Sequence, residues 1–293
     1  RKKTVQVDGE TQTGWFASDF TLAEIKTLGG ISTDAERPQQ YNGLYKIVTF
    51  QEIIDAAKKY SVNGRVVAVY PETKNPTYHR ELGLPIEDKL IAMVKAAGWN
   101  SKDAPIYVQS FEPGSLKYMK AQGLNTRLIQ LIDADDVDLA TGKLTYAAPY
   151  DRPYDWFKAG DKRLFSDMVT PAGLAEIKTY ADGIGPWKPY IMSVKGQLDA
   201  NGKVKDINGD GKVNYADASS LPPTTLIADA HKAGLMVHAY TFRNESRRIP
   251  ADFKGDPKAE YKAFCRLGLD GVFSNFADTA IQARTEYLRE MGR

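Results

Sequence analysis

An acid and a base stand two residues apart at the end of an apolar run. Residues 66–70 (VVAVY) are typical of a strand buried on both faces of a parallel sheet, and Pro71, Glu72 and Lys74 follow at once. On an extended chain, side chains at i and i+2 point the same way. Because parallel α/β folds place their chemistry at the carboxyl ends of strands, Glu72 and Lys74 are candidates for a functional site. The alternative is an ordinary surface ion pair at a strand end.

A second group of residues has the spacing of a calcium-binding loop. In the sequence DINGDGKVNYAD (206–217), positions 1, 3, 5, 7, 9 and 12 are Asp206, Asn208, Asp210, Lys212, Asn214 and Asp217. Gly211 at position 6 permits the sharp turn, and position 7 would offer its backbone carbonyl oxygen. Asp in place of Glu at position 12 resembles the dockerin type of loop. The spacing predicts a structural Ca²⁺ ion, and the alternative is a polar turn without an ion.

Composition narrows the class of protein. A chain of 293 residues with 42% hydrophobic content can bury a large core, as one large domain or two small ones. Its 39 basic and 37 acidic residues give no polycationic face, which argues against a nucleic-acid-binding protein. No apolar run approaches the roughly 18 residues of a membrane span, and the single cysteine, Cys265, excludes an intrachain disulfide or a Cys-based zinc site. No leader peptide opens the sequence, so we expect any export signal to have been removed.

Predicted helices and strands alternate along the chain. Helical periodicity and end signals predict helices over 50–60, 86–99, 113–123, 170–181, 224–234 and 257–268. Apolar runs predict strands over 65–70, 105–111, 126–133, 182–192, 235–243 and 269–276. This alternation is typical of a parallel α/β fold. Two stretches without helical period, about 134–169 and 195–220, are predicted to be loop insertions at the carboxyl face of the sheet.

Five segments, in order, resemble the glycerophosphodiester phosphodiesterases, most closely the periplasmic type. They are YPETK (70–74), the strand ending in QSF (109–111), DGIGPWKP (182–189), HAYTFRNE (238–245) and DGVFSNFADTA (270–280). The likeness runs from FTLAEIKTL (20–28) to near the C-terminus. It implies a TIM-type (β/α)8 barrel that hydrolyses glycerophosphodiesters to glycerol 3-phosphate and an alcohol. It also implies a divalent cation at the active site, Ca²⁺ or Mg²⁺, and a periplasmic or secreted location.

The same resemblance implies roles for individual residues. Glu72 would be a metal ligand, and carboxylate oxygens suit a hard cation. Lys74 would contact the phosphate as a point charge. The other residues that would bind this small-molecule substrate are Gln109, Phe111, Trp187, Tyr240 and Arg243.

The chain departs from the family pattern in its catalytic motifs. In the family, the first strand ends in His-Arg-Gly, the second ends in Glu-x-Asp, and a His-Asp pair follows; these positions supply the catalytic histidines and most metal ligands. None of the three histidines here stands in such a context: His79 is expected in a loop, His231 on a solvent-facing helix and His238 in the core. We therefore predict that residues 1–293 form one barrel domain that lacks the first two βα units and is inactive alone. The alternative is a non-catalytic, calcium-binding interaction module derived from the same barrel.

Overall fold

The structure of this protein, a computed structural model, describes residues 1–293 and divides them into two compact units. The N-terminal unit comprises Arg1–Gln109 and Tyr118–Arg127, and the C-terminal unit comprises Ser110–Lys117 and Leu128–Arg293. Helix α5 (Pro113–Ala121) contributes residues to both. Whether the chain is a single barrel domain stays a prediction.

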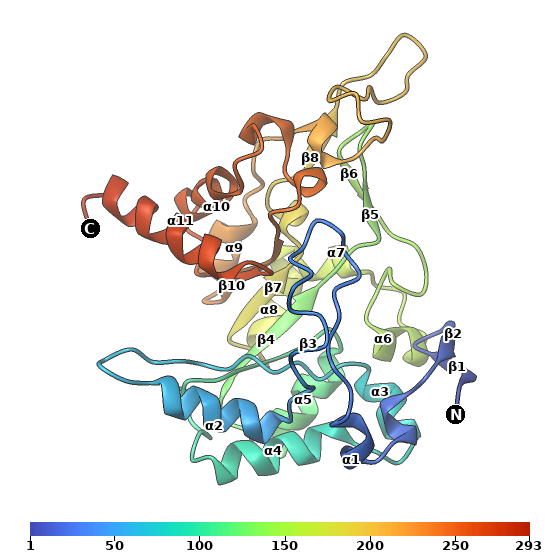
Figure 1. Cartoon of the computed structure of the whole chain (residues 1–293), viewed down its shortest axis with the longest axis vertical. Helices are drawn as coiled ribbons and strands as arrows, with labels where there is room; N and C mark the ends of the chain where they lie inside the picture. Colours follow the sequence, from blue (N-terminus) through green and yellow to red (C-terminus); the bar gives the residue numbers. More distant parts are fainter. The chain divides into compact units, whose positions relative to one another are not determined.

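The N-terminal unit joins a β-hairpin to helices and one short strand (Figure 1). Its elements are β1 (Lys3–Val7), β2 (Glu10–Gly14), η1 (Ala17–Asp19), α1 (Leu22–Ile25), α2 (Phe50–Tyr60), α3 (Pro76–Glu81), α4 (Ile86–Ala96) and β3 (Tyr107–Ser110). The hairpin turns at Asp8 and Gly9, whose φ angles of 49° and 86° suit the tight turn that Asp-Gly favours. Helix α2 starts at a capping box, in which Thr49 accepts a hydrogen bond from the Glu52 N–H and Glu52 accepts one from the Thr49 N–H. Its predicted bounds, 50–60, are confirmed.

The apolar run before Glu72 pairs with β3 only from Val69 onward. The Val69 N–H donates to Pro105 O at 2.9 Å, and the Thr73 N–H donates to Gln109 O at 3.0 Å. Parallel bridges join Val69 to Ile106 and Glu72 to Gln109. The predicted strand over 65–70 does not form: residues 61–75 contain only these isolated bridges, Val66 is 70% exposed, and only Val69 of the run is buried. The prediction of a strand buried on both faces is therefore wrong. An apolar sequence favours a strand, but burial of both faces also requires neighbouring elements that a local pattern does not specify.

The C-terminal unit is built on a parallel sheet. Strands β4 (Arg127–Ile132), β7 (Gly183–Pro186), β10 (Met236–Phe242) and β11 (Gly271–Ser274) lie in the order β4-β7-β10-β11, and neighbouring strands are parallel. The helices that follow strands are α8 (Pro171–Lys178), α9 (Leu226–Lys232), α10 (Pro257–Arg266) and α11 (Ala277–Glu290). Ile129, Ile184 and Val237 are fully buried at the centre of this sheet. The predicted parallel α/β fold is confirmed, while the sheet is open and does not close into a barrel.

Several predicted element bounds change in the structure. The strand predicted over 182–192 ends at Pro186, and the single 3-10 turn η2 (Lys188–Tyr190) follows it. Helix α8 begins after Thr170, which accepts a hydrogen bond from the Gly173 N–H, and has Pro171 in its first turn. Short 3-10 turns η4 (Ser246–Arg248) and η5 (Ala251–Phe253) lie between β10 and α10. Helix α11, after the last strand, lies outside the predicted elements.

The two insertions contain regular structure and are not plain loops, which corrects the prediction. Residues 134–169 hold the antiparallel strands β5 (Asp136–Asp138) and β6 (Lys143–Thr145) and the helices α6 (Tyr154–Ala159) and α7 (Phe165–Met168). The second insertion, about 195–220, includes most of β8 (Val194–Gly196), the turn η3 (Tyr215–Asp217) and β9 (Ala218–Ser220), and β8 and β9 pair antiparallel. Val137, Val194 and Ala218 form a small shared core. Strands of three residues are too short for sequence periodicity to reveal.

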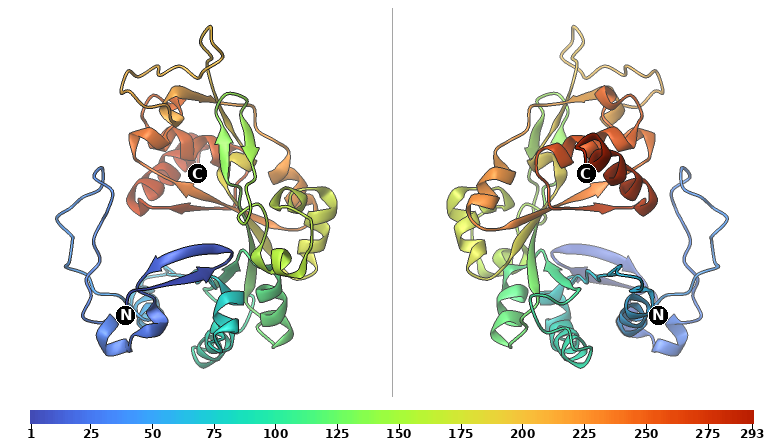
Figure 2. Two further views of the ribbon diagram at one scale, coloured as in Figure 1. Left: turned by 90° about the vertical axis from the view of Figure 1, so that its right-hand side faces the viewer. Right: turned by 90° about the vertical axis from the view of Figure 1, so that its left-hand side faces the viewer.

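The segment between β8 and β9 projects from the C-terminal unit in both views of Figure 2. It contains residues 206–217. No helix of the structure is both long enough and apolar enough to cross a lipid bilayer.

Candidate functional site

Glu72 and Gln109 place two buried oxygen atoms side by side in the N-terminal unit. The two residues are bridge partners at the carboxyl ends of neighbouring extended segments. Glu72 Oε1 and Gln109 Oε1 are both buried, and neither accepts a hydrogen bond. A buried acceptor without a donor carries a desolvation cost of about 1–3 kcal/mol unless something else satisfies it. Carboxylate and amide oxygens are ligands of hard cations, so this pair could hold part of a divalent metal site.

Lys74 supplies a positive charge next to this pair. Its Nζ lies 3.5 Å from Glu72 Oε1, and its side chain is 72% exposed while that of Glu72 is 22% exposed. The structure therefore confirms that the acid and the base lie together, as an ion pair on the solvent side of the strand end. An exposed ammonium is available to an anion such as a phosphate.

These residues supply only some of the ligands that a divalent cation needs. Nowhere in residues 1–293 do three or more His, Cys, Asp or Glu side chains lie together in a group that could hold a metal ion. Glu72 thus belongs to no such group of three, and Gln109 offers one neutral oxygen. A hard divalent cation takes six or more oxygen ligands, so further ligands would have to come from water, substrate or other residues.

The sequence did not reveal that the turn of the β1–β2 hairpin contacts Asn75, the residue after Lys74. Asn75 Nδ2 donates a hydrogen bond to Asp8 Oδ2 at 2.6 Å, and Asn75 itself has a left-handed φ of 48°. Burial raises the pKa of Asp8, while the hydrogen bond from Asn75 and the nearby His79 oppose this shift. The Asp-Gly dipeptide at the turn is a hairpin signal that could have placed Asp8 in advance. His79 lies on helix α3, which corrects its expected place in a loop.

Aromatic side chains gather at strand ends in the C-terminal unit. The ring centroids of Phe111 and Tyr240 are 6.1 Å apart with the planes at 87°, and Trp187 bridges to Tyr240 through the backbone. Phe165 from the first insertion meets Phe111 edge-on, with centroids 6.1 Å apart. The Tyr240 hydroxyl donates to Ile132 O at 3.0 Å, which fixes that ring. Three predicted site residues are thus brought together, and Phe165, which was not among the predicted site residues, joins them from the first predicted insertion.

Arg243 is held by a buried carboxylate. Its Nε and Nη2 donate to Glu245 Oε2 and Oε1 at 2.9 and 2.8 Å, and Glu245 is 2% exposed. This bidentate pair orients the guanidinium and offsets its charge. Arg243 stays a predicted substrate contact.

A buried ion pair anchors the segment that follows Trp187. Lys188 Nζ donates to Glu260 Oε1 on helix α10, and the two residues are 5% and 2% exposed. Burial raises the pKa of Glu260, and the ammonium of Lys188 opposes that shift. This pair has no signal in the sequence, because Lys188 and Glu260 are 72 residues apart.

The predicted calcium loop is ordered by its own backbone. Asp206 accepts hydrogen bonds from the Gly209 and Gly211 N–H groups at 2.7 and 2.8 Å. Asp217, which is 1% exposed, accepts from the Ile207 N–H at 2.9 Å and reaches back across the loop. Asn208, Asp210 and Asn214 likewise accept from the Asp210, Lys212 and Ala216 N–H groups. These bonds close the loop, and a Ca²⁺ ion in it stays a prediction.

The remaining two histidines lie near the amino ends of β10 and β11. His238 is 7% exposed, so its expected place in the core is confirmed, and burial lowers its pKa against the influence of Asp270. His231 Nε2 lies 2.8 Å from Asp270 Oδ2.

The parallel sheet and the groups at its strand ends define an α/β protein of the kind that places polar and aromatic side chains at the carboxyl ends of its strands. The model of the Glycerophosphoryl diester phosphodiesterase family matches residues 2–279, so the match begins upstream of the expected residue 20. This chain belongs to that family.

Individual relatives agree with this assignment. The chain is 34% identical over 289 residues to a glycerophosphodiester phosphodiesterase of Arabidopsis thaliana, and the match covers 94% of this chain and 66% of the relative. It is 26% identical over 287 residues to a glycerophosphodiester phosphodiesterase of Haemophilus influenzae, covering 92% of this chain and 70% of that one. The chain thus spans about two thirds of the length of these relatives.

A solved structure shares the fold. The crystal structure of a Silicibacter pomeroyi protein, described provisionally as a glycerophosphoryl diester phosphodiesterase, matches with a TM-score of 0.53 and 15% identity. The match covers 99% of this chain and 75% of that one.

Proposed function

We propose that the protein containing this chain hydrolyses glycerophosphodiesters to glycerol 3-phosphate and an alcohol, with a divalent cation, Ca²⁺ or Mg²⁺, bound at Glu72. The observation that carries this proposal is the pair of buried oxygens, Glu72 Oε1 and Gln109 Oε1, that accept no hydrogen bond beside the exposed Lys74. Membership of the family supports the same reaction.

Each residue type suits one requirement of the reaction. A bound divalent cation supplies neutralising charge to the non-bridging oxygens of the phosphodiester. Lys74, which is paired with Glu72 and 72% exposed, adds a cation that can approach a phosphate oxygen. Gln109 orients a ligand through its amide, and Phe111, Tyr240 and Trp187 offer apolar surface to the carbon skeleton. Arg243 adds a guanidinium that Glu245 holds in a fixed orientation.

The acid–base groups are proposed to come from residues outside 1–293. Cleavage of a phosphodiester requires a proton donor for the leaving oxygen, a role for which histidine is suited. The resemblance supports assigning that role to the first two βα units of a (β/α)8 barrel, because none of the three histidines of this chain stands in the family's catalytic motifs. Residues 1–293 alone are then inactive, and the alternative of a non-catalytic calcium-binding module predicts no activity for the longer protein either.

The decisive experiment is Glu72→Gln in the full-length protein. Loss of the charge that binds the cation should lower turnover of glycerophosphocholine at least about a hundredfold, the scale of losing one key electrostatic contact. Glu290→Gln is the matched control, because Glu290 makes only exposed ion pairs at the end of α11. Turnover near that of the wild type in Glu72→Gln would refute the assignment, and added chelator should abolish the wild-type activity.

We also propose that residues 206–217 bind a structural Ca²⁺ ion through Asp206, Asn208, Asp210, Asn214, Asp217 and the carbonyl of Lys212. The spacing of these residues supports this proposal. Binding would have to draw the carboxylates of Asp206, Asp210 and Asp217 together, because in the structure they accept hydrogen bonds from the loop's own backbone and do not form a group that could hold a metal ion. At saturating Ca²⁺ the linkage should stabilise the fold by a few kcal/mol. Thermal unfolding is measured in chelator and in millimolar Ca²⁺, for the wild type and for Asp210→Ala. If Ca²⁺ shifts neither midpoint, the loop is a polar turn without an ion.

The location and pathway follow from the same proposal. The likeness to the periplasmic type supports a periplasmic or secreted protein, and the proposed products place it in lipid and glycerol metabolism. Cell fractionation with an antibody to the chain tests the location, and recovery in the cytosolic fraction would contradict it.

A further inference from the structure

Gln130 is a polar residue in the middle of an apolar strand. It lies in β4, whose sequence is RLIQLI, and it is fully buried. Its Nε2 donates hydrogen bonds to the carbonyl oxygens of Phe111 and Leu131, both at 2.9 Å. Its Oε1 accepts from the Tyr180 hydroxyl at 3.0 Å. Burying an amide is costly, so a Gln at this point needs these bonds, whereas packing alone could be met by Leu or Met.

The hydrogen bond from Gln130 restrains Phe111, whose ring contacts the rings of Phe165 and Tyr240. The Phe111 ring stands between Phe165 and Tyr240, and its carbonyl is the acceptor for Gln130. The segment from Ser110 to Pro113 leaves β3 and enters α5, so it has no strand or helix ladder of its own at Phe111. Gln130 therefore fixes the backbone of Phe111, while Phe165 and Tyr240 restrict its ring.

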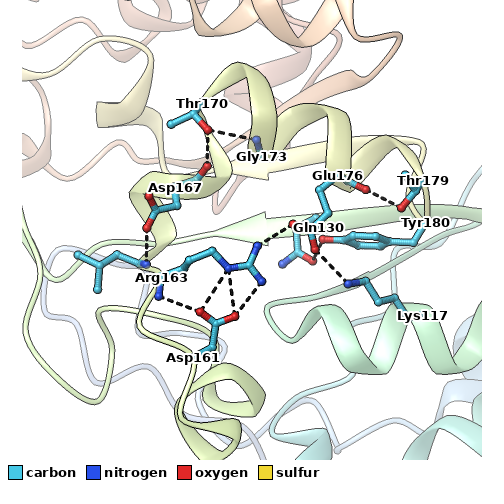
Figure 3. A network of polar contacts seen from close by, with 11 residues as sticks. Lys117, Gln130, Asp161, Arg163, Asp167, Thr170, Gly173, Glu176, Thr179 and Tyr180 are labelled. Atoms are coloured by element: carbon cyan, nitrogen blue, oxygen red, sulfur yellow. Dashed lines mark hydrogen bonds and ion pairs between the residues drawn. The ribbon is translucent and has the colours of Figure 1, made fainter.

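Tyr180 connects Gln130 to a charged network on the outside of the unit (Figure 3). Lys117 Nζ lies 4.8 Å from the centroid of the Tyr180 ring and donates to Glu176 Oε1 at 3.2 Å. Arg163 from the first insertion donates to Glu176 Oε2 at 2.6 Å and pairs with Asp161. The Arg163 guanidinium also stacks 4.1 Å from the Trp156 ring centroid.

The same network holds the first insertion in place. Arg163 and Phe165 both belong to that insertion, so Arg163 ties it to α8 two residues before Phe165 meets Phe111. Phe111 is thereby held from two directions: its backbone by Gln130 and Tyr180, and its ring by an insertion that Glu176 anchors.

We propose that Gln130, supported by Tyr180, is a positioning residue that sets the affinity for substrate by fixing Phe111. The proposal rests on the proposed function only in taking Phe111 as a substrate contact. Phe111 offers apolar surface that contacts bound substrate in the ground state and the transition state alike. Loss of its fixed position should therefore raise KM and leave kcat nearly unchanged.

The first experiment measures the Phe111 carbonyl directly. Phe111-Glu112 is the only Phe-Glu pair in this sequence, so labelling Phe at the carbonyl carbon with ¹³C and Glu with ¹⁵N isolates one NMR cross-peak. Loss of the peak in Phe111→Leu confirms its assignment in the full-length protein. In Gln130→Met the peak should move, because the carbonyl loses a hydrogen bond, and in Tyr180→Phe it should move less.

A matched control removes a similar hydroxyl elsewhere. Tyr118→Phe deletes a hydroxyl that donates to Asp88 at 2.6 Å in the N-terminal unit. It should leave both the peak and the kinetics as in the wild type. Tyr180→Phe also serves as the milder variant if Gln130→Met does not fold, because it keeps the aromatic ring and the Gln130 amide.

The second experiment measures hydrolysis of glycerophosphocholine. Gln130→Met should raise KM about fivefold to tenfold, the ratio that corresponds to one neutral hydrogen bond, with kcat within about twofold of the wild type. Tyr180→Phe should raise KM by less. An unmoved peak in Gln130→Met overturns the proposal, and so does a moved peak with wild-type KM or a fall in kcat at constant KM.

If the proposed hydrolysis does not occur, the experiments give a result that differs from failure of the Gln130 proposal. In that case the full-length wild type hydrolyses no glycerophosphodiester, while the carbonyl peak still shows whether Gln130 fixes Phe111. Titration with glycerol 3-phosphate then replaces the kinetics: it should shift the Phe111 peak, with weaker binding in Gln130→Met. Equal affinity in both proteins, or no shift in either, overturns the proposal.

Discussion

Replacing Lys188 by Met should destabilise the fold in a way that depends on pH. The side chains have similar length, so Lys188→Met removes the ammonium, together with its contact to the Phe242 ring, and keeps most of the packing of the side-chain stem. Glu260 is 2% exposed, and its Oε2 accepts no hydrogen bond even in the wild type. Removing one partner of a buried ion pair costs about 3–5 kcal/mol, because the other charge is left buried without compensation. We expect a loss in this range at pH 8.

The loss of stability caused by Lys188→Met should become smaller as the pH falls. Burial already raises the pKa of Glu260 above its unfolded value of about 4.3, and loss of Lys188 removes the charge that opposes this rise. A carboxyl whose pKa is higher in the folded state binds its proton more tightly there, so stability falls as the pH rises from the unfolded value through the folded one. Near pH 4 the carboxyl is largely protonated, and the variant should lose much less stability than at pH 8.

Urea unfolding at pH 8 and pH 4 measures both effects. Lys232→Met, at an exposed position on α9, is the control for replacing a lysine by a methionine. The double variant Lys188→Met/Glu260→Leu should recover most of the loss, because an apolar pair of similar volume can replace a buried ion pair at little cost. A loss that is equal at both pH values, or a double variant no more stable than the single one, would refute this reasoning.

Two further predictions concern β7 and β10. Gly183→Ala should lower the free energy of unfolding by about 1–3 kcal/mol, because the new Cβ would lie 2.8 Å from Met236 O. Gly14→Ala is the control, since its Cβ would meet open space and the free energy should change little. Equal losses in the two variants, measured by urea unfolding, would contradict the packing argument. Burial lowers the pKa of His238 against the influence of Asp270, so the neutral ring is favoured and stability should fall as the pH drops below about 6.5. An NMR titration that gives His238 a pKa of 6.5 or higher would contradict this.

The sequence specified those elements whose signals are local. Helix α2 follows from an apolar stripe and a Thr49–Glu52 capping box, both of which lie within 12 residues. The strands β4 and β10 are apolar runs long enough to be recognised, and the alternation with helices defines a parallel α/β fold. The position of Glu72 and Lys74 just after such a run also marked the acid and base that the structure brings together.

Tertiary structure decided everything that depends on partners distant in the sequence. Val66 is exposed although its neighbours are apolar, because burial requires elements that lie elsewhere in the chain. Gln130 binds the Phe111 carbonyl across 19 residues, and Lys188 pairs with Glu260 across 72. A side chain's local pattern shows which backbone conformation it favours, whereas a hydrogen bond or ion pair forms only where folding brings two groups within about 3 Å. For this reason the sequence marked Glu72, Lys74 and Phe111, and only the fold showed what holds Phe111 in place.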